Sequence, residues 1–316
     1  MTARTPTGGP LPMGPLDWGT LVLLSVLWGG SFFFAKVAVS ELPPLVLVLV
    51  RVALAAVLLL GVLAVSGGLK RVPMRLLGAF LVMGLLNNVI PFSLIFWAQT
   101  SIPSGLASIL NATTPLFTVL VAHAFTRDEK LSVGRLIGVL AGFAGVAVMI
   151  GPGLLEDLGT HLPAQLACLG AALSYGLSSV YGRRFRGLPP MLTAASQLAA
   201  STVLLAPVVA VLHPPATLAW PSMPVVAAVV ALAAASTAFA YILFFRILGR
   251  NGATNISLVT LLVPVSAILL GAVVLGEALE AREFAGFGLI AFGLAAIDGR
   301  PARFIAQRVG TGFSPR

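Results

Sequence analysis

The sequence predicts an all-α protein that crosses a membrane many times. Of its 316 residues, 58% are hydrophobic and only 9% are charged, and its mean hydropathy is +1.03. Soluble domains are about 25% charged, so this chain has too few polar residues to cover its surface in water. Apolar runs of roughly 20 residues recur along it, the length of helix that crosses about 30 Å of hydrocarbon. A third observation, an internal repeat, gives the arrangement of these helices.

Ten membrane-spanning helices can be drawn between breaks that are rich in Pro and Gly. They are expected at residues 17–36, 44–65, 74–98, 103–124, 131–150, 163–183, 190–212, 222–246, 253–275 and 281–299. Outside them, residues 1–16 are rich in Pro and Gly and are expected to form a disordered tail. Residues 300–316 are expected to form a basic tail.

The basic residues predict how these helices are oriented. Sixteen of the 19 Lys and Arg residues lie on one side of the predicted spans, and the remainder are Lys36, Arg51 and Arg282. Loops on the cytoplasmic side of a membrane carry an excess of Lys and Arg. Both tails are therefore expected in the cytoplasm. The net charge of +9 then follows from topology and does not indicate nucleic acid as a partner.

Much of the second half of the chain repeats the first. Residues 105–151 and 252–299 share one order: an apolar run broken by a single Pro, a short charged segment, and a Gly-rich apolar run. A shift of 148 residues aligns Glu129 with Glu277. Both glutamates lie at span ends, where turn and interface charges are expected. An internal repeat of this length indicates a duplicated membrane protein.

The repeat extends to the first helices of each half, and it must be inverted. Trp28 aligns with Tyr175, and Arg51 aligns with Gln197 in the second span. Each half has five spans, an odd number, so the second half enters the membrane in the opposite orientation. Inverted repeats are a known transporter architecture, with the substrate site near the middle of the membrane between the repeats. The predicted fold is two inverted five-helix repeats, at residues 17–151 and 160–299, around a central cavity.

This pattern resembles the EamA repeats of the drug/metabolite transporter superfamily. The resemblance is carried by Pro115, Glu129-x-Leu131 and Gly138 in the first half, and by Glu277-x-Leu279 and Gly286 in the second. Asp128 departs from the family pattern, which often has Gly before this first Glu. Within the superfamily, the sequence is most similar to the YddG-type exporters of aromatic and other amino acids. The resemblance implies ten helices around a central cavity and export of small metabolites across a bacterial cytoplasmic (inner) membrane.

Polar and aromatic residues inside the spans are candidates for the cavity wall. Trp28 and Tyr175 lie about halfway along equivalent spans and are flanked by small residues. The polar candidates are Asn87, Asn88, Asn111, Ser178, Thr237, Tyr241 and Thr260. A polar side chain in hydrocarbon costs several kcal/mol unless it is hydrogen-bonded, so these side chains must face protein or a wet cavity. Packing between helices, and hydrogen bonds between or within helices, are the alternative roles.

Arg51 is the one clear charge inside a predicted span. It follows Pro43 by eight residues, about 12 Å along a helix. In a cavity, its guanidinium could hold a substrate carboxylate. Alternatively, its long side chain could reach the membrane surface, and the sequence leaves both readings open.

The acidic residues bear on energy coupling. All ten lie at or near span ends or in loops, so the sequence offers no midplane carboxylate to carry a proton or hold sodium. Transport down a substrate gradient is therefore favoured over tight ion coupling.

Prolines and glycines inside the spans have separate expected roles. Pro115, Pro264 and Pro91 should kink or loosen their helices, which makes them candidate hinges for alternating access, although tolerated kinks are equally consistent. The spaced glycines of 134–145 and 286–293 are expected to permit close helix packing, because no strand precedes them as a dinucleotide-binding loop would require.

The predicted function is export of amino acids, aromatic and other neutral ones, or of similar small metabolites, by alternating access. An exporter of amphipathic drugs or other metabolites is the main alternative, and a channel is a further one. An intramembrane enzyme would need clustered His, a Ser with a His partner or paired carboxylates at depth. The three His residues are dispersed along the sequence, there is no HExxH motif, and no acid lies inside a span, so this class is disfavoured. No catalytic residue, metal site or cofactor is predicted. The expected partners are a small-molecule substrate and the lipid bilayer, and a monomer is plausible.

Overall fold

The computed structural model describes residues 13–126, 132–150, 161–256 and 258–298, and these residues form helices joined by short connections. No strand occurs among them, in agreement with the predicted all-α fold. Most of both predicted tails lies outside the described residues. The first helix begins at Pro15, two residues before the predicted span.

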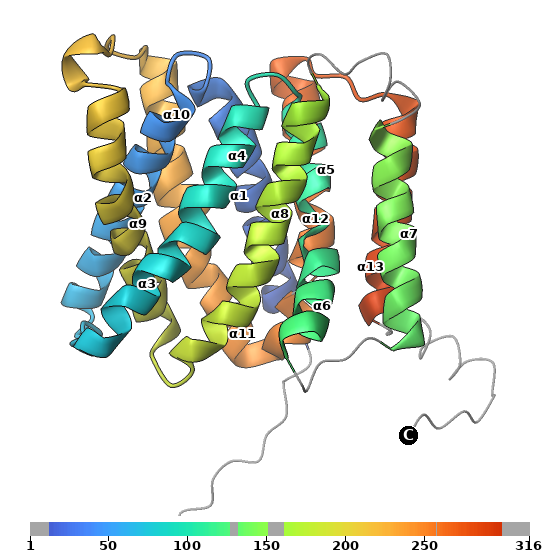
Figure 1. The fold of residues 1–316 in the computed structure, drawn as a ribbon, viewed down its shortest axis with the longest axis horizontal. Coiled ribbons are helices and arrows are strands. Elements are labelled where there is room, and N and C mark those ends of the chain that lie inside the picture. Colours follow the sequence, from blue (N-terminus) through green and yellow to red (C-terminus); the bar gives the residue numbers. More distant parts are fainter. Residues whose placement is uncertain (1–12, 127–131, 151–160, 257, 299–316) are drawn as a thin grey trace, which may run out of the picture.

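Five helical spans form each half of the molecule (Figure 1). In the first half they are α1 (Pro15–Ala38), α2 (Pro44–Val65), α3 (Leu77–Gly84) with α4 (Ile90–Ala98), α5 (Ser104–Asn111) with α6 (Thr114–Phe125), and α7 (Val133–Ile150). In the second half they are α8 (Leu162–Tyr181), α9 (Pro190–Leu212), α10 (Met223–Ala233) with α11 (Ala240–Ile256), α12 (Val259–Leu275), and α13 (Ala281–Asp298). The predicted ten-helix fold is therefore confirmed.

The third span of each half contains a π-helical turn at an equivalent place. Leu85–Val89 joins α3 to α4, and Ala234–Phe239 joins α10 to α11. A π turn adds one residue to a helical turn and changes which side chains face a neighbour, and such turns are frequent at functional sites. The two π turns therefore lie at equivalent positions of the two repeats.

One span boundary differs from the prediction. α11 continues to Ile256, ten residues past the predicted end of that span, so the expected break before Gly252 is helical instead. The fourth span is broken between α5 and α6, next to Pro115, which was expected to kink or loosen its helix. A proline lacks the amide hydrogen that a continuous helix needs at that position.

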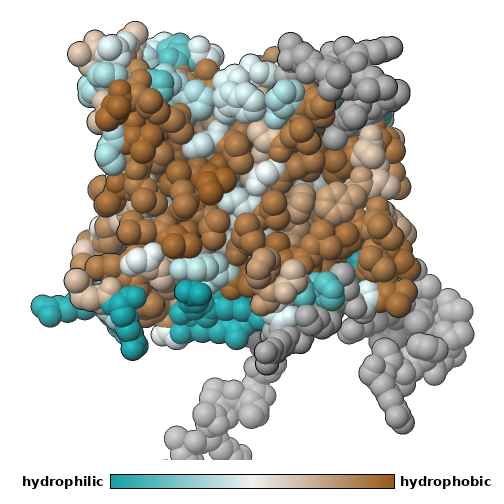
Figure 2. Space-filling model, in the orientation of Figure 1, coloured by the Kyte–Doolittle hydropathy of each residue, from teal (hydrophilic) through white to brown (hydrophobic). Residues whose placement is uncertain are grey.

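Hydrophobic side chains form a broad band across the face of the molecule that Figure 2 shows. Within the described part of the chain, six helical spans are long and apolar enough to cross a membrane: Pro15–Ala38, Pro44–Val65, Met74–Ala98, Ser104–Phe125, Pro190–Leu212 and Met223–Asn251. One end of the molecule, at the lower edge of Figure 2, carries exposed basic side chains and is called the basic face below. They are Lys70, Arg71, Arg75, Arg184, Arg186, Arg246 and Arg250. This arrangement agrees with the basic pattern of the sequence.

Helix pairing follows the two-fold relation between the halves. α1 packs against α12, and its counterpart α8 packs against α5 and α6. The second and the fifth spans pair with their own counterparts, because α2 packs against α9 and α7 against α13. Gly29 of α1 and its counterpart Gly176 of α8 make these contacts close. A Cβ on Gly29 would lie 2.8 Å from the Val263 carbonyl oxygen, and one on Gly176 would lie 3.1 Å from the backbone of Phe117.

The α7–α13 pair stands at one edge of the molecule (Figure 1). Two pairs of glycines hold these helices in contact, as their spacing predicted. A Cβ on Gly138 would lie 2.5 Å from the Gly293 carbonyl oxygen, and one on Gly145 would lie 2.6 Å from that of Gly286. Larger residues at these positions would force the two helices apart.

Candidate functional site

A cavity of about 800 Å³ lies between the two halves of the molecule. Its walls come from α1, α2, α4, α5 and α6 of the first half and from α8, α9, α11 and α12 of the second, together with both π turns. This volume falls within the roughly 300–1,000 Å³ of typical small-molecule sites. The cavity therefore occupies the place that an inverted repeat predicts for a substrate.

The cavity opens toward the basic face and is closed at the opposite end. Its lining includes the exposed residues Arg186 and Gly187, from the connection that follows α8. At the other end, the lining residues Phe32, Phe96 and Gln99 are all buried. Among the described residues, the exposed lining at the basic face therefore gives a solute a way into the cavity.

Polar contacts hold the closed end together. The Gln99 side-chain amide donates to the Phe32 carbonyl at 2.7 Å, and Lys36 Nζ donates to the Gln99 carbonyl at 2.6 Å. The Glu277 carboxylate, from the second half, accepts from the Ser104 backbone N–H at 2.9 Å and from its hydroxyl at 2.6 Å. Glu277 therefore caps the N-terminus of α5, where a negative charge is favourable, and ties the two halves together. The sequence had indicated a turn or interface charge for Glu277.

Arg51 lines the cavity, which decides between its two predicted positions. The side chain is buried, and its Nε donates to the Thr237 hydroxyl at 3.0 Å. Thr237, in the second π turn, donates in turn to the Leu232 carbonyl of α10 at 2.8 Å. The guanidinium also lies over the Phe92 ring, 3.8 Å from its centroid, and 5.6 Å from that of Phe96. These contacts fix one positive charge in the wall of the cavity.

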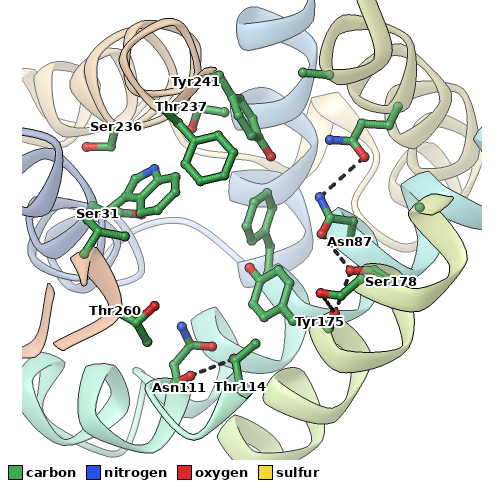
Figure 3. A pocket seen from close by; sticks show the side chains of 18 of the residues that line it. Ser31, Asn87, Asn111, Thr114, Tyr175, Ser178, Ser236, Thr237, Tyr241 and Thr260 are labelled. Carbon is green, nitrogen blue, oxygen red and sulfur yellow. Dashed lines mark hydrogen bonds between the residues drawn. The ribbon is translucent and has the colours of Figure 1, made fainter. Parts of the chain in front are cut away.

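Amides and hydroxyls form a connected network on another wall. Ser178 donates to Asn87 Oδ1 at 2.9 Å, and Asn87 Nδ2 donates to Gln197 Oε1 at 3.4 Å (Figure 3). The Tyr241 hydroxyl lies near the Asn87 and Gln197 side chains. Because the network joins α8, α9, α11 and the first π turn, it couples helices of both halves at the cavity.

Aromatic rings make up much of the remaining surface. Trp28 of α1 packs against Phe244 of α11, with 5.5 Å between the ring centroids. Trp28 and its repeat counterpart Tyr175 both line the cavity, as predicted. Such rings offer apolar contact area at a small cost in conformational entropy.

Three buried polar atoms in the lining have no hydrogen-bond partner among the described residues. They are Asn111 Oδ1, at the break between α5 and α6, the hydroxyl oxygen of Ser236, in the second π turn, and Gln99 Oε1, at the closed end. The backbone carbonyl of Asn111 accepts from Thr114 at 2.7 Å, while Thr260 completes this side of the cavity (Figure 3). An unpartnered buried polar atom is costly, and in a cavity it is available to a ligand.

Asn88 is the one predicted cavity residue that the structure places elsewhere. It is fully buried, and its Nδ2 donates to the Ser201 hydroxyl of α9 at 2.9 Å. Gly84 lets α3 approach α9 closely enough for this contact, because a Cβ there would lie 2.8 Å from that same hydroxyl. Asn88 therefore joins two helices, the alternative role recognised for these amides.

The three predicted hinge prolines lie close to irregular helix geometry. Pro91 follows the first π turn, Pro115 follows the break between α5 and α6, and Pro264 lies inside α12. Their role as hinges stays a prediction.

Phe92, Phe96 and Gln197 line the cavity but were not predicted as site residues. Gln197 carried a signal, since it aligns with Arg51 in the repeat. Phe92 and Phe96 are four residues apart and so lie on one face of α4, against which the Arg51 guanidinium packs. Their apolar sequence context did not indicate that this face lines a cavity. Among the described residues, no group of three or more His, Cys, Asp or Glu side chains is placed to hold a metal ion.

Comparison with known proteins gives one family and several relatives. The model of the EamA-like transporter family matches residues 18–151 and 162–297 separately, so it finds the repeat in both halves. The chain is 31% identical over 280 residues to the Escherichia coli (strain K12) protein named "Uncharacterized inner membrane transporter YedA", covering 87% of this chain and 88% of that one. It is 28% identical over 295 residues to a "Probable amino-acid metabolite efflux pump" of Salmonella typhimurium, covering 89% and 94%.

A solved structure has the same fold. It superposes with a TM-score of 0.63 at 23% sequence identity and covers 92% of this chain and 97% of its own. At this identity, the similarity extends to the fold alone.

Proposed function

The chain belongs to the EamA-like transporter family, and from that premise we propose that it exports amino acids, aromatic and other neutral ones, or similar small metabolites by alternating access. Membership of the family makes it a membrane transporter. The choice of substrate is supported by the chemistry of the cavity and by the printed name of the Salmonella relative.

The observation that carries this proposal is the buried Arg51 in a cavity lined mainly by aromatic, amide and hydroxyl side chains. A guanidinium forms strong charge-assisted hydrogen bonds with a carboxylate. The rings of Trp28, Phe244 and Tyr175 would contact an aromatic or aliphatic side chain. A cavity wall with one buried charged group, Arg51, and a large apolar surface suits an amino-acid-like solute better than a small inorganic ion.

We propose that the basic face is cytoplasmic and that both tails lie on that side, as the basic pattern predicts. The described conformation is then open to the cytoplasm, which is the state that loads a solute for export. The contacts of Lys36, Gln99 and Glu277 would close the far end in this state. Export requires these contacts to open while the cytoplasmic end closes.

Energy coupling is proposed to come from the substrate gradient. Among the described residues that line the cavity there is no Asp or Glu, so the wall offers no carboxylate to bind and release a proton. This agrees with the sequence, in which acids lie at or near span ends or in loops.

The test is counter-flow uptake of labelled phenylalanine into liposomes that contain the purified protein, with and without an imposed pH gradient. We expect saturable uptake that other amino acids compete for and that the gradient leaves unchanged. Uptake that depends on the gradient would contradict the proposed coupling. Absence of uptake with phenylalanine, while amphipathic drugs or other metabolites show counter-flow, would overturn the substrate assignment in favour of the alternative.

A further inference from the structure

We propose that this cavity selects solutes with a net charge of −1. The preferred class is carboxylates whose amino group is absent or acylated, such as N-acylated amino acids, ahead of the free zwitterionic amino acids. This inference rests on the proposed function, because it names the favoured class within the amino-acid-like solutes that the cavity is proposed to carry.

The charges that line the cavity have one sign. Among the described lining residues, the only charged side chains are Arg51 in the wall and Arg186 at the mouth. A mouth and wall of one sign attract solutes of the opposite charge and disfavour cations. The cavity therefore has positive charges for a carboxylate but no negative charge for an ammonium group.

Arg51 has part of its guanidinium free for a ligand. Its Nε is held by Thr237, and its flat face lies against Phe92. Among the described residues, no side chain or carbonyl accepts from its two terminal nitrogens. Because Arg51 lines the cavity, these nitrogens can donate to one carboxylate in a fixed orientation.

A single carboxylate balances the charge of this site, and a zwitterion does not. Arg51 is buried without an acidic partner among the described residues, which is an unfavourable state for a cation in a membrane protein. A monoanion supplies the missing negative charge. A zwitterion supplies it too, but also brings an ammonium group into the same low-dielectric space with no counter-charge, so part of the gain is lost.

The unpartnered polar atoms fit an amide better than an ammonium. Asn111 Oδ1, the Ser236 hydroxyl oxygen and Gln99 Oε1 are buried neutral acceptors of the lining without partners among the described residues. An acylated amine has a single N–H, which one such acceptor satisfies. An ammonium carries a full positive charge, which neutral acceptors on different elements would compensate poorly.

The test compares four solutes that share one ring but differ in charge. Proteoliposomes with the wild-type protein are assayed at pH 7 for inhibition of labelled N-acetylphenylalanine counter-flow. The unlabelled competitors are 3-phenylpropionate, N-acetylphenylalanine, phenylalanine and phenylalanine amide. We expect half-inhibition by the two anions at concentrations at least about tenfold lower than by phenylalanine. The cationic amide should compete least.

The variant Arg51→Gln tests whether the guanidinium causes this preference. Gln is chosen because it is the residue at the equivalent position of the second half. In this variant, we expect the half-inhibition concentrations of phenylalanine and N-acetylphenylalanine to become about equal, so that their ratio falls to about one. The variant Arg51→Lys should retain part of the wild-type ratio. Thr202→Val, which alters a hydroxyl bonded to its own helix and not in the cavity lining, should leave the ratio unchanged.

Two results would overturn this inference while leaving the proposed transport of amino acids intact. One is phenylalanine competing as well as the anions in the wild-type protein. The other is a preference for anions that survives in Arg51→Gln. Failure of all four solutes to compete or to show counter-flow would instead reject the proposed function, and this inference with it.

Discussion

The most informative single residue is Arg51, because it breaks the two-fold relation of the site. Its counterpart in the second half is Gln197, and both side chains line the same cavity. The repeat accounts for equivalent helices in both halves, whereas the charged side chain is present only in the first half. The site can therefore bind a polar group of the solute at one defined place, although the surrounding helices are related by symmetry.

Thr237 is predicted to position the Arg51 guanidinium. Its hydroxyl accepts from Arg51 Nε at 3.0 Å, so Thr237→Val removes that bond while nearly keeping the side-chain volume. A hydrogen bond to a charged group contributes about 1.5–3 kcal/mol, and part of this loss should appear as a weaker hold on the solute carboxylate. We expect KM for counter-flow to rise about tenfold or more with little change in the amount of folded protein.

Thr202→Val is the matched control, because the Thr202 hydroxyl bonds to the Leu198 carbonyl of its own helix. It should leave KM unchanged. Equal KM values for Thr237→Val and the wild-type protein would contradict a positioning role for Thr237.

For single residues, the sequence predicted which residue types occur in the site better than it predicted which side of a helix each side chain is on. Asn87 and Asn88 are neighbours in one span, and only Asn87 faces the cavity. Successive residues of a helix point about 100° apart, and the sequence does not specify the rotation of that helix about its axis. Arg51 posed the same problem, because depth along a helix says nothing about the side of the helix on which a residue lies.

Among the elements, the two π turns position polar residues of the site in both halves. They carry Asn87 on one side and Ser236 and Thr237 on the other. The sequence predicted the spans that contain them but not the turns, because an added residue in a helical turn is stabilised by contacts with neighbouring helices. α11 extends beyond its predicted end for a related reason, since packing determines a helix boundary together with local propensity.

The close crossing of α7 and α13 predicts a clear effect of added volume. In Gly145→Ala, the new Cβ would lie 2.6 Å from the Gly286 carbonyl oxygen, whereas Gly134→Ala in the same helix would meet no atom within 4 Å. Both variants gain similar helix propensity, so their difference isolates the packing. Overpacking costs about 1–3 kcal/mol, and we expect a Tm several degrees lower for Gly145→Ala than for Gly134→Ala.

Cys168 supplies the measurement. It is the single cysteine of the chain and is buried, so it reacts with a thiol-reactive dye only as the protein unfolds in detergent. Matching melting curves for the two alanine variants would contradict the close crossing.

For the whole molecule, the inverted repeat was the most reliable sequence signal. The shared pattern and the odd number of spans predicted two halves of opposite orientation, and the mirrored helix pairs confirm that arrangement. The open end of the cavity was not predictable. A transporter that works by alternating access adopts states open to either side of the membrane, and the same sequence encodes both states. Only the contacts within one conformation therefore reveal which end of the cavity is closed.

The central claim is that the transported solute binds in the cavity between the two halves, and protection of a cysteine in its wall tests this most directly. In a Cys168→Ala background, Ser179→Cys places a thiol at an exposed position of the cavity lining. Ser40→Cys, which lies in the exposed turn after α1 and outside the cavity, is the control. The rate of alkylation is measured with increasing phenylalanine or N-acetylphenylalanine.

We predict that the solute slows alkylation of the Ser179→Cys variant, with half-protection at the concentration that half-saturates counter-flow, and leaves the Ser40→Cys variant unaffected. Alkylation of the Ser179→Cys variant that stays constant at solute concentrations saturating transport would contradict the claim that this cavity is the binding site.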